Sequence, residues 1–393
     1  MVDMFLSNKL NQYYLKMIPM LGLCKDFNGF LEKVFLRLKR KKMPQIVVYG
    51  SYGFTGNLIA EIASKSDKNV LLSGRDPLKL QEQGARLKLN TRVAALDSGQ
   101  DLDALLKDAS VVIHCAGPFV HTWKPMADAC LRNGCHYLDI TGEVSVFESL
   151  KKMDDAFGLR GLMAMPGVGF DVVPTDCMAA LLKKEQPDAT HLEMAFMGLG
   201  GGVSRGTAKT MIENLGKGGL VRQEGVLKRV RTAHKTRRID FIEKRSQVVT
   251  IPWGDLSTAF TSTGIPNVTV YMSATKSMIR SMRLSNYLAP LLRMGIVRKR
   301  LEKTINQRQP GPDKRSRENG AALIWGEVRN DSGEIKRAVF KTAEGYRLTA
   351  EMAWSIAGKV QSGFLKEGYQ TPSSVYGGDL IFEHPDTGWL EKP

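Results

Sequence analysis

The sequence predicts an α/β protein built on a doubly wound parallel sheet, followed by a second, α+β domain. The first observation is a buried run, Ile46-Val47-Val48-Tyr49, that leads through a glycine-rich turn into an apolar helical pattern. The second is that short apolar runs alternate with helical segments from Pro44 to about Lys184. The third is a change of pattern near Ala189, after which strands alternate polar and apolar residues. Alternating strands and helices are typical of right-handed βαβ units, whose parallel sheet is covered on both faces.

Each strand of the parallel sheet is expected at a short apolar run. These runs are Ile46 to Tyr49, Val70 to Leu72, Val93 to Ala95, Val111 to Cys115, Tyr137 to Ile140 and Leu162 to Met165. Alternation in the second domain predicts a mixed or antiparallel sheet. Its strands are expected at His191 to Phe196, Ser246 to Ile251, Asn267 to Ser273, Ala321 to Val328 and Lys336 to Lys341.

The domain boundaries follow from these patterns. Residues 44–188 form the first domain and residues 189–342 are inserted as the second domain. The helical pattern from Ala343 to Val360 then returns the chain to the first domain, so residues 343–393 belong to it, with a final segment near Tyr376 to Phe382.

Residues 1–43 precede the first strand as an extension. Apolar residues recur there at helical spacing, with basic residues on another face, which predicts a basic amphipathic helix. The apolar residues are Phe30, Leu31, Val34, Phe35 and Leu38. Three interpretations stay open: the helix rests on anionic lipid, it docks on the protein itself, or translation starts at Met43 and the extension has no function.

Composition narrows the class of protein. The chain has 393 residues and 43% hydrophobic content, enough for two domains with substantial cores. The five cysteines show no CxxC pair, so we expect no structural zinc, no disulfide framework and a reducing cytoplasm. No apolar stretch approaches the roughly 20 residues of a membrane span. Charged residues also interrupt the N-terminus, which argues against a secretory signal.

The net charge of +16 could serve to bind an anionic partner or could belong to an ordinary solvated surface. Positive charge concentrates at Lys39 to Lys42, Lys228 to Arg245 and Lys276 to Lys303. No zinc finger, RNA-binding aromatic signature or helix-turn-helix accompanies it, so no nucleic-acid partner is predicted. An ordinary solvated surface is favoured, a peripheral contact with an anionic membrane stays open, and so does a homodimer.

The glycine-rich turn after the first strand predicts a nucleotide site of the Rossmann type. Its glycines let the backbone approach a pyrophosphate, and the N-terminus of the following helix favours the negative charge. The residues expected to bind are Gly50, Tyr52, Gly53, Phe54, Thr55 and Gly56. Arg75 follows the second strand, where a guanidinium would pair with a 2′-phosphate and so select NADP. Asp76 could instead accept from a ribose hydroxyl and select NAD, and Arg75 could be a solvated charge.

Later strand ends supply further candidates. Small residues at Cys115, Ala116, Gly117 and Pro118 would let the backbone approach the nicotinamide side of the cofactor, although they could also be an ordinary proline turn. Asp139, Glu143 and Asp171 are the candidate catalytic groups for proton handling.

For Glu143 a helix cap is the alternative. A glycine-rich segment from Gly198 to Thr207 is expected either to contact an anion, with Ser204, Arg205 and Thr207 as donors, or to be an interdomain loop. No metal site is predicted.

Five motifs, taken together, resemble a known family. They are Gly50 to Gly56, Gly74 to Leu80, Cys115 to Phe119, Tyr137 to Glu143 and Pro166 to Asp176. They resemble the saccharopine dehydrogenase-like oxidoreductases, and more closely the trans-acting enoyl reductase branch. The resemblance extends to Gly345 to Ala350 and Gly368 to Pro372, and so covers about Met43 to the C-terminus.

The resemblance implies a Rossmann domain completed by C-terminal elements, and reduction with NADPH. Its enoyl reductase branch implies unsaturated acyl chains on a carrier as substrates. Two positions depart from the family pattern: Ser51-Tyr52 replaces alanine-threonine, and Ser204-Arg205-Gly206-Thr207 replaces Ser-Gly-Gly-Thr. The second departure puts the substrate class in doubt.

The leading hypothesis is an NAD(P)H-dependent oxidoreductase that reduces a C=C bond, as in a lipid-like acyl chain, or a C=N bond, at a cleft between the domains. The alternative from another class is a non-catalytic NADP-binding protein at a membrane surface. It would use the basic extension and the positive stretch from Arg280 to Lys303 as its contacts.

Overall fold

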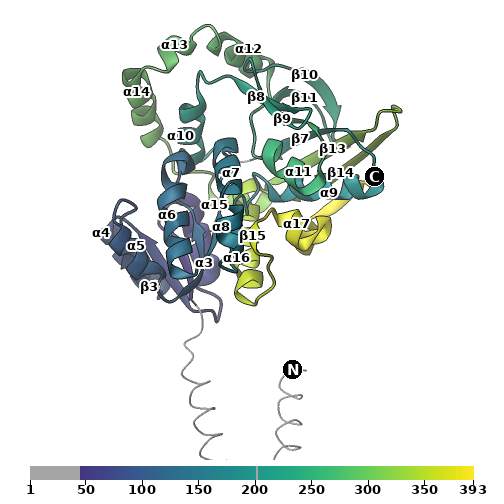
Figure 1. The fold of residues 1–393 in the computed structure, drawn as a ribbon. Helices are drawn as coiled ribbons and strands as arrows, with labels where there is room; N and C mark the ends of the chain where they lie inside the picture. Colours follow the sequence, from purple (N-terminus) through teal and green to yellow (C-terminus); the bar gives the residue numbers. More distant parts are fainter. Residues whose placement is uncertain (1–44, 201) are drawn as a thin grey trace, which may run out of the picture. The chain divides into compact units, whose positions relative to one another are not determined.

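The computed structural model describes residues 45–200 and 202–393 (Figure 1). The expectations for the N-terminal extension, including the basic amphipathic helix and the Lys39 to Lys42 cluster, lie outside the described residues. Gly201 in the expected glycine-rich segment also lies outside them.

The first sheet is parallel throughout and confirms the predicted α/β class. It has seven strands in the order β15-β6-β5-β4-β1-β2-β3. Its strands are β1 Gln45–Tyr49, β2 Val70–Gly74, β3 Asn90–Val93, β4 Ala109–His114, β5 His136–Asp139, β6 Met163–Met165 and β15 Gly368–Tyr369. The order reverses at β1, where β2 and β4 lie on opposite sides. A crevice at the carboxyl ends of the strands is expected at such a reversal.

Helices bury both faces of this sheet. Residues of β1 alternate between two cores: Ile46 and Val48 face one, whereas Val47 and Tyr49 face the other. The helices of the sheet are α3 Phe54–Ala63, α4 Pro77–Leu87, α5 Gly99–Leu106, α6 Phe119–Asn133, α7 Val144–Lys151, α8 Asp154–Gly158 and α16 Gly345–Gln361. Helix α16 comes from the far end of the sequence, yet it packs against α3 and β4. Burial on both faces explains why these strands are near-continuous apolar runs.

The third strand is shifted from its expected place. It was expected at Val93 to Ala95 and runs instead over Asn90–Val93, with every residue exposed. The reason is its position at the edge of the sheet, where polar residues are tolerated and apolar content no longer marks the strand. Ala94 is buried just after the strand ends.

The second sheet is mixed, as expected, and has nine strands. The path β10-β11-β12-β7-β13-β14-β16 is extended by β8, which pairs with β12 and β9. Its strands are β7 His191–Leu199, β8 Gly219–Gln223, β9 Val226–Val230, β10 Thr236–Asp240, β11 Arg245–Thr250, β12 Asn267–Ser273, β13 Ala321–Arg329, β14 Ile335–Ala343 and β16 Gly388–Glu391. Sequence reasoning missed β8, β9, β10 and β16, because charged residues interrupt the apolar alternation of these short strands.

Helices of the second half pack on this sheet or project from it. Helix α9, Val173–Glu185, contacts α11, Asp255–Thr263, and both contact the sheet. The remaining helices are α10 Arg205–Asn214, α12 Lys276–Ser285, α13 Ala289–Leu292, α14 Gly295–Asn306, α15 Lys314–Asn319, α17 Pro372–Tyr376 and the 3₁₀ helix η2 Gly378–Glu383. Figure 1 shows α12, α13 and α14 as an arc at the top of the view.

The C-terminal residues return to both sheets. Strand β15 extends the parallel sheet beside β6, whereas β16 pairs with β14 of the second sheet. The last residues therefore lie against the second sheet, and only α16 and β15 add to the first. None of the helices in residues 45–200 and 202–393 combines the length and hydropathy that a membrane span needs.

Candidate nucleotide and active site

The glycine loop between β1 and α3 is shaped so that only glycine fits at its key positions. Gly50 has a φ of +76°, and a Cβ there would lie 2.9 Å from the backbone nitrogen of Ala116. A Cβ on Gly56 would lie 2.4 Å from the carbonyl oxygen of Gly50. The loop is closed by a hydrogen bond of 3.0 Å from the N–H of Gly53 to that same carbonyl. These close approaches keep the loop tight against the neighbouring strand end.

The N-terminus of α3 is suited to bind an anion. Its N-cap residue is Gly53, which provides no side-chain cap. The first N–H groups of a helix have no partner within the helix, and the positive end of the helix dipole adds to their effect. Phe54, Thr55 and Gly56 supply these groups. The loop and helix therefore fit a dinucleotide pyrophosphate.

Tyr52 joins the glycine loop to the end of β2. Its hydroxyl accepts hydrogen bonds from the N–H groups of Arg75 and Asp76, at 3.2 and 3.1 Å. Its ring lies so close to Gly74 that a Cβ there would be 2.5 Å from a ring carbon. The departure from the family pattern at Tyr52 thus fixes the backbone that presents Arg75.

The two candidates for cofactor selection are placed differently. Asp76 caps α4: its carboxylate accepts from the N–H of Lys79 at 3.2 Å and pairs with the Lys79 ammonium at 3.2 Å. These bonds hold the pKa of Asp76 below its usual range, first through the backbone of Lys79 and then through its side chain. Arg75 is exposed, and its guanidinium makes no hydrogen bond or ion pair to the described residues. This arrangement favours a 2′-phosphate over a ribose hydroxyl.

We expect Arg75→Ala to weaken NADPH binding by about ten- to a hundredfold and to leave NADH binding nearly unchanged. Losing a charge-assisted hydrogen bond to the 2′-phosphate costs about 1.5–3 kcal/mol of binding free energy. NADH has no 2′-phosphate, so its binding does not depend on this bond. Titration of nicotinamide fluorescence with both nucleotides measures the two affinities. Arg132→Ala, which removes another surface guanidinium paired with Asp103, is the matched control. Equal losses for NADPH and NADH would assign Arg75 no part in selecting the phosphate.

Residues Cys115 to Pro118 form the wall opposite the glycine loop. The N–H of Cys115 donates to the carbonyl of Tyr49 at 2.8 Å, which holds this segment to β1. Burial, with a smaller contribution from the charge of Asp139, raises the pKa of the Cys115 thiol. The thiol is therefore protonated at neutral pH, and the segment contributes backbone and small side chains to the site.

Asp139 is held in place by three donors. Its carboxylate accepts from the Tyr137 hydroxyl at 2.7 Å and from the N–H groups of Gly167 and Thr141 at 2.9 and 3.0 Å. Complete burial raises its pKa to about 6, although these hydrogen bonds oppose the shift. The bonds connect the ends of β5 and β6, so the geometry favours a structural role for Asp139.

Glu143 caps a helix, but not the one that follows it in the sequence. Its two oxygens accept from the N–H groups of Phe119 and Val120 at 2.8 and 2.9 Å, at the start of α6. Burial raises the pKa of Glu143, and the two backbone bonds oppose that shift. Thr210 of α10 lies 3.5 Å from one of its oxygens. Glu143 therefore fixes the start of α6 and also lies beside α10.

Asp171 differs from Asp139 and Glu143 in the surroundings of its carboxylate. It is half-buried, and its carboxylate makes no hydrogen bond or ion pair to the described residues. It lies over Gly142, where a Cβ would be 2.7 Å from one carboxylate oxygen. Burial of the carboxyl raises its pKa to about 7, and the charge of Glu143 adds to the shift. Among the predicted proton-handling groups, Asp171 alone combines an available carboxyl with a pKa near neutrality.

Residues from the second half complete the surroundings of the glycine loop. Tyr346 at the start of α16 packs edge-on against Phe54, with 5.1 Å between ring centroids. Its hydroxyl accepts from the N–H of Ser204 at 2.6 Å and lies 2.9 Å from the Thr207 hydroxyl. Arg317 also stacks on Phe54, 5.5 Å from the ring centroid. Sequence reasoning gave Tyr346 and Arg317 no role, because their contacts with Phe54 join residues far apart in the chain.

The predicted donors of the glycine-rich segment divide into two groups. Ser204 and Thr207 are both tied to Tyr346 near the loop. The Arg205 side chain instead donates to the carbonyl of Arg308 at 2.6 Å, and its N–H donates to Pro310 at 2.9 Å. Arg205 thereby anchors the segment that carries Gly311 over Phe54, where a Cβ would lie 2.5 Å from the ring.

Aromatic side chains lie next to Asp171. Phe170 contacts Phe196 edge-on at 5.7 Å, and Phe196 contacts Trp253 at 5.3 Å. All three rings are partly exposed. They provide an apolar surface beside a titratable carboxyl, which is the usual composition of a small-molecule site. Across residues 45–200 and 202–393, no group of three or more His, Cys, Asp or Glu side chains is arranged to hold a metal ion.

Comparison with known proteins agrees with this geometry. The family described as saccharopine dehydrogenase NADP binding domain matches residues 46–165. A saccharopine dehydrogenase-like oxidoreductase of Rattus norvegicus is 28% identical over 205 residues, which are 46% of this chain and 48% of that protein. A trans-acting enoyl reductase of Mycobacterium leprae is 34% identical over 147 residues, 35% of this chain and 34% of that protein. The chain thus spans about half or less of the length of these two relatives.

Two further similarities extend beyond the nucleotide-binding region. A lipid droplet localized protein of Caenorhabditis elegans is 27% identical over 272 residues, 62% of this chain and 63% of that protein. The solved apo structure of saccharopine dehydrogenase (L-Glu forming) from Saccharomyces cerevisiae has a TM-score of 0.61 at 11% identity, covering 86% of this chain and 96% of that one. At this identity the likeness concerns the fold alone.

Proposed function

We propose that this protein is an NADPH-dependent reductase with Asp171 as its proton donor, since residues 46–165 match the saccharopine dehydrogenase NADP binding domain. The observation that carries the proposal is the Asp171 carboxyl. It is without a hydrogen-bond partner in the described part of the chain, its pKa is raised to about 7, and it follows a strand of the nucleotide-binding sheet.

In this proposal, different residues of the chain would bind the cofactor and transfer the proton. The N–H groups at the start of α3 would hold the pyrophosphate, and Arg75 the 2′-phosphate. The small residues from Cys115 to Pro118 would let the nicotinamide side approach the sheet. When bound, NADPH supplies a hydride. Protonated Asp171 would supply the matching proton, so that hydride and proton together saturate one double bond of the substrate.

The substrate is proposed to carry an electron-poor C=C bond, as in an α,β-unsaturated acyl chain, or a C=N bond. The rings of Phe170, Phe196 and Trp253 support an apolar group beside the reacting bond. The similarity to a trans-acting enoyl reductase supports the acyl alternative, and the match of residues 46–165 to the saccharopine dehydrogenase NADP binding domain supports the imine alternative.

A substrate panel tests the proposal. The full chain, with NADPH deuterated at the transferring position, is offered α,β-unsaturated acyl thioesters of increasing length, and separately 2-oxo acids with amines. Deuterium in a reduced product identifies the reaction and the class of bond. A protein that binds NADPH tightly but transfers deuterium to neither class would refute the reductase proposal.

A second candidate function, a peripheral contact with an anionic membrane, is favoured by the arc of α12 to α14. Large apolar side chains are exposed along one short stretch: Leu284, Tyr287, Leu288, Leu291, Met294 and Ile296. Arg280, Arg283, Lys299 and Arg300 are exposed beside them. Apolar and basic side chains together bind anionic interfaces. The similarity to a lipid droplet localized protein agrees with this candidate.

We expect the full chain to sediment with vesicles containing anionic lipid at low salt, and a Leu288→Glu/Leu291→Glu variant to lose at least about tenfold in binding. Each glutamate removes apolar contact and adds repulsion from the lipid charge. The control is Leu78→Glu/Leu159→Glu, which changes two exposed leucines outside the arc. Vesicle binding that both variants retain would exclude the arc as the contact.

A further inference from the structure

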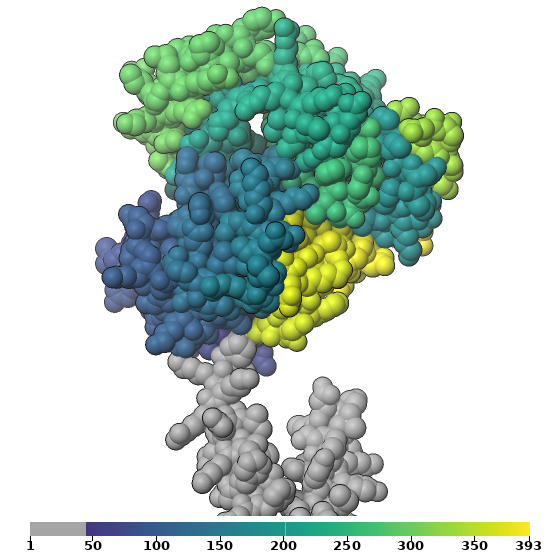
Figure 2. Space-filling model, in the orientation of Figure 1, coloured from purple at the N-terminus to yellow at the C-terminus, as the bar shows by residue number. Residues whose placement is uncertain are grey.

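A cavity of about 630 Å³ lies between the β8–β9 hairpin and the segment that joins α12 to α13. A neighbouring cavity of about 390 Å³ shares Arg231, His234 and Asn286 with it. Figure 2 shows the surface hollowed here, between the light-green arc of α12 to α14 and the teal strands. Neither cavity includes a residue of the glycine loop or the candidate proton donors. The cavities are therefore a feature separate from the nucleotide site.

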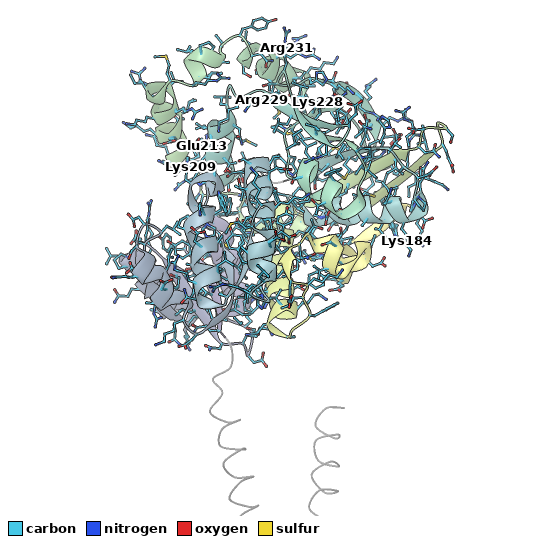
Figure 3. All side chains as sticks on the ribbon, viewed as in Figure 1. Lys184, Lys209, Glu213, Lys228, Arg229 and Arg231 are labelled. Carbon is cyan, nitrogen blue, oxygen red and sulfur yellow. The ribbon has the colours of Figure 1, made fainter. Side chains whose placement is uncertain are left out.

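Every side chain lining the two cavities that can carry a charge near neutral pH is basic. They are Lys217, Arg229, Arg231, His234, Arg283 and Arg293. Figure 3 labels Arg229 and Arg231 at the end of the β8–β9 hairpin, with Glu213 of α10 across the opening. Glu213 is already engaged, at 3.5 Å from Arg298 and 3.6 Å from His121. The cavities therefore concentrate positive charge without a lining carboxylate to neutralise it.

The walls of the cavity are held by specific contacts. The side chain of Asn286 accepts from the N–H of Thr232 at 2.8 Å and donates to its carbonyl at 3.1 Å. Arg293 donates to the carbonyl of Gly216 from Nε and Nη2, at 2.9 and 2.7 Å. A guanidinium has five N–H groups, so Arg293 keeps donors for a ligand while it fixes the wall.

Several arginines elsewhere on the same sheet are paired with acids. Arg222 contacts Glu148 at 2.7 Å, Arg245 contacts Asp240 at 2.6 Å, and Arg237 bonds Glu193. By contrast, the side chains of Arg229, Arg231 and Arg283 make no ion pair or hydrogen bond within the described residues. Like charges held together repel one another, so their grouping costs free energy that an anionic ligand would offset.

We propose that the two adjoining cavities together bind a ligand carrying at least two phosphate groups. Planar guanidinium groups match phosphate oxygens bidentately, and several of them around one cavity can contact more than one phosphate. The phosphates can belong to a soluble molecule or to a lipid head group. Tyr287, which lines the smaller cavity and is 77% exposed, would contact the apolar part of a lipid.

The test uses the full chain with NADPH present at saturation, so that the glycine loop is filled. Inorganic pyrophosphate is titrated by calorimetry, and vesicles of phosphatidylcholine with and without phosphatidic acid are tested by sedimentation. The test variant is Arg229→Gln/Arg231→Gln. The control, Lys183→Gln/Lys184→Gln, removes the same charge from the last turn of α9. All changed residues lie at the surface, and NADPH affinity and the thermal unfolding curve report whether each variant is folded.

We expect binding in at least one arm, weakened about tenfold or more by Arg229→Gln/Arg231→Gln and unchanged by the control. Pyrophosphate binding without vesicle binding would assign a soluble ligand, and the reverse would assign a lipid head group. Two results would overturn the proposal: no anion binding in either arm, or equal loss in both double variants, which would indicate a general effect of net charge.

Discussion

Asp171→Asn is expected to lower the rate of NADPH-dependent reduction by about a hundred- to ten-thousandfold and to leave NADPH affinity within about twofold of its original value. A positioned proton donor contributes a factor of this size to the rate. The asparagine amide has the same shape but cannot transfer a proton to the substrate. Stopped-flow measurement of NADPH oxidation with the best substrate of the panel gives the rate, and fluorescence titration gives the affinity.

The pH dependence gives a second measure of the same prediction. Burial and the charge of Glu143 raise the pKa of Asp171 to about 7, so the carboxyl is protonated below that pH. Reduction requires the protonated form, and kcat/KM should therefore fall as the pH rises through about 7. The reverse reaction, oxidation by NADP, requires the deprotonated form and should become faster over the same range. The Asp171→Asn variant should lack this transition in both directions.

Two other aspartates provide the comparison. Asp139→Asn disturbs a carboxylate that accepts three hydrogen bonds, so it should lower the melting temperature as well as the rate. Asp128→Asn, at an exposed ion pair with Lys124, should change neither quantity appreciably. A normal rate in Asp171→Asn, or a loss explained by its melting temperature, would remove Asp171 from the mechanism.

The second large effect is expected at the glycine loop. Gly56→Ala should weaken NADPH binding by at least about a hundredfold and lower the free energy of unfolding by about 1–3 kcal/mol. The added Cβ would lie 2.4 Å from the carbonyl oxygen of Gly50 and 3.0 Å from Cα of Ser51, so the loop or the start of α3 must move. That movement displaces the N–H groups proposed to bind the pyrophosphate.

Gly99→Ala is the matched control, because it adds the same methyl group at the start of helix α5. Its nearest neighbour is a terminal nitrogen of Arg132, 3.8 Å away, so there is room for the methyl group. Titration with NADPH and thermal unfolding measure both variants. Equal affinities for Gly56→Ala and Gly99→Ala would show that the close approach at Gly56 is not required for the nucleotide.

Local signals explain how much of the fold could be predicted. Strands buried on both faces are near-continuous apolar runs, so β1, β2 and β4 could be read from the sequence. Gly50, Gly53 and Gly56 mark a tight turn, which could be predicted because the spacing of neighbouring glycines alone indicates it. Strand β9 could not be found in the same way. It lies at the surface with only β8 beside it, and its sequence Val226–Val230 contains two basic residues.

The candidate site shows the same limit at the level of single residues. In the sequence, Asp139, Glu143 and Asp171 look alike, because each carboxylate follows a buried strand. Their differences depend on partners from other strands and helices: three donors for Asp139, the start of α6 for Glu143, and none within the described residues for Asp171. Tyr346 is a further example, since its contact with Phe54 joins positions almost 300 residues apart.

The packing of α16 against α3 also has a consequence during protein synthesis. Ribosomes release the glycine loop early, but the residues Gly345–Gln361 that cover α3 emerge only after strands β7 to β14 of the second sheet. Until then, the face of α3 that packs against α16 has no cover. The nascent chain before α16 would therefore be a substrate for chaperones, and stable cofactor binding would wait for the synthesis of α16.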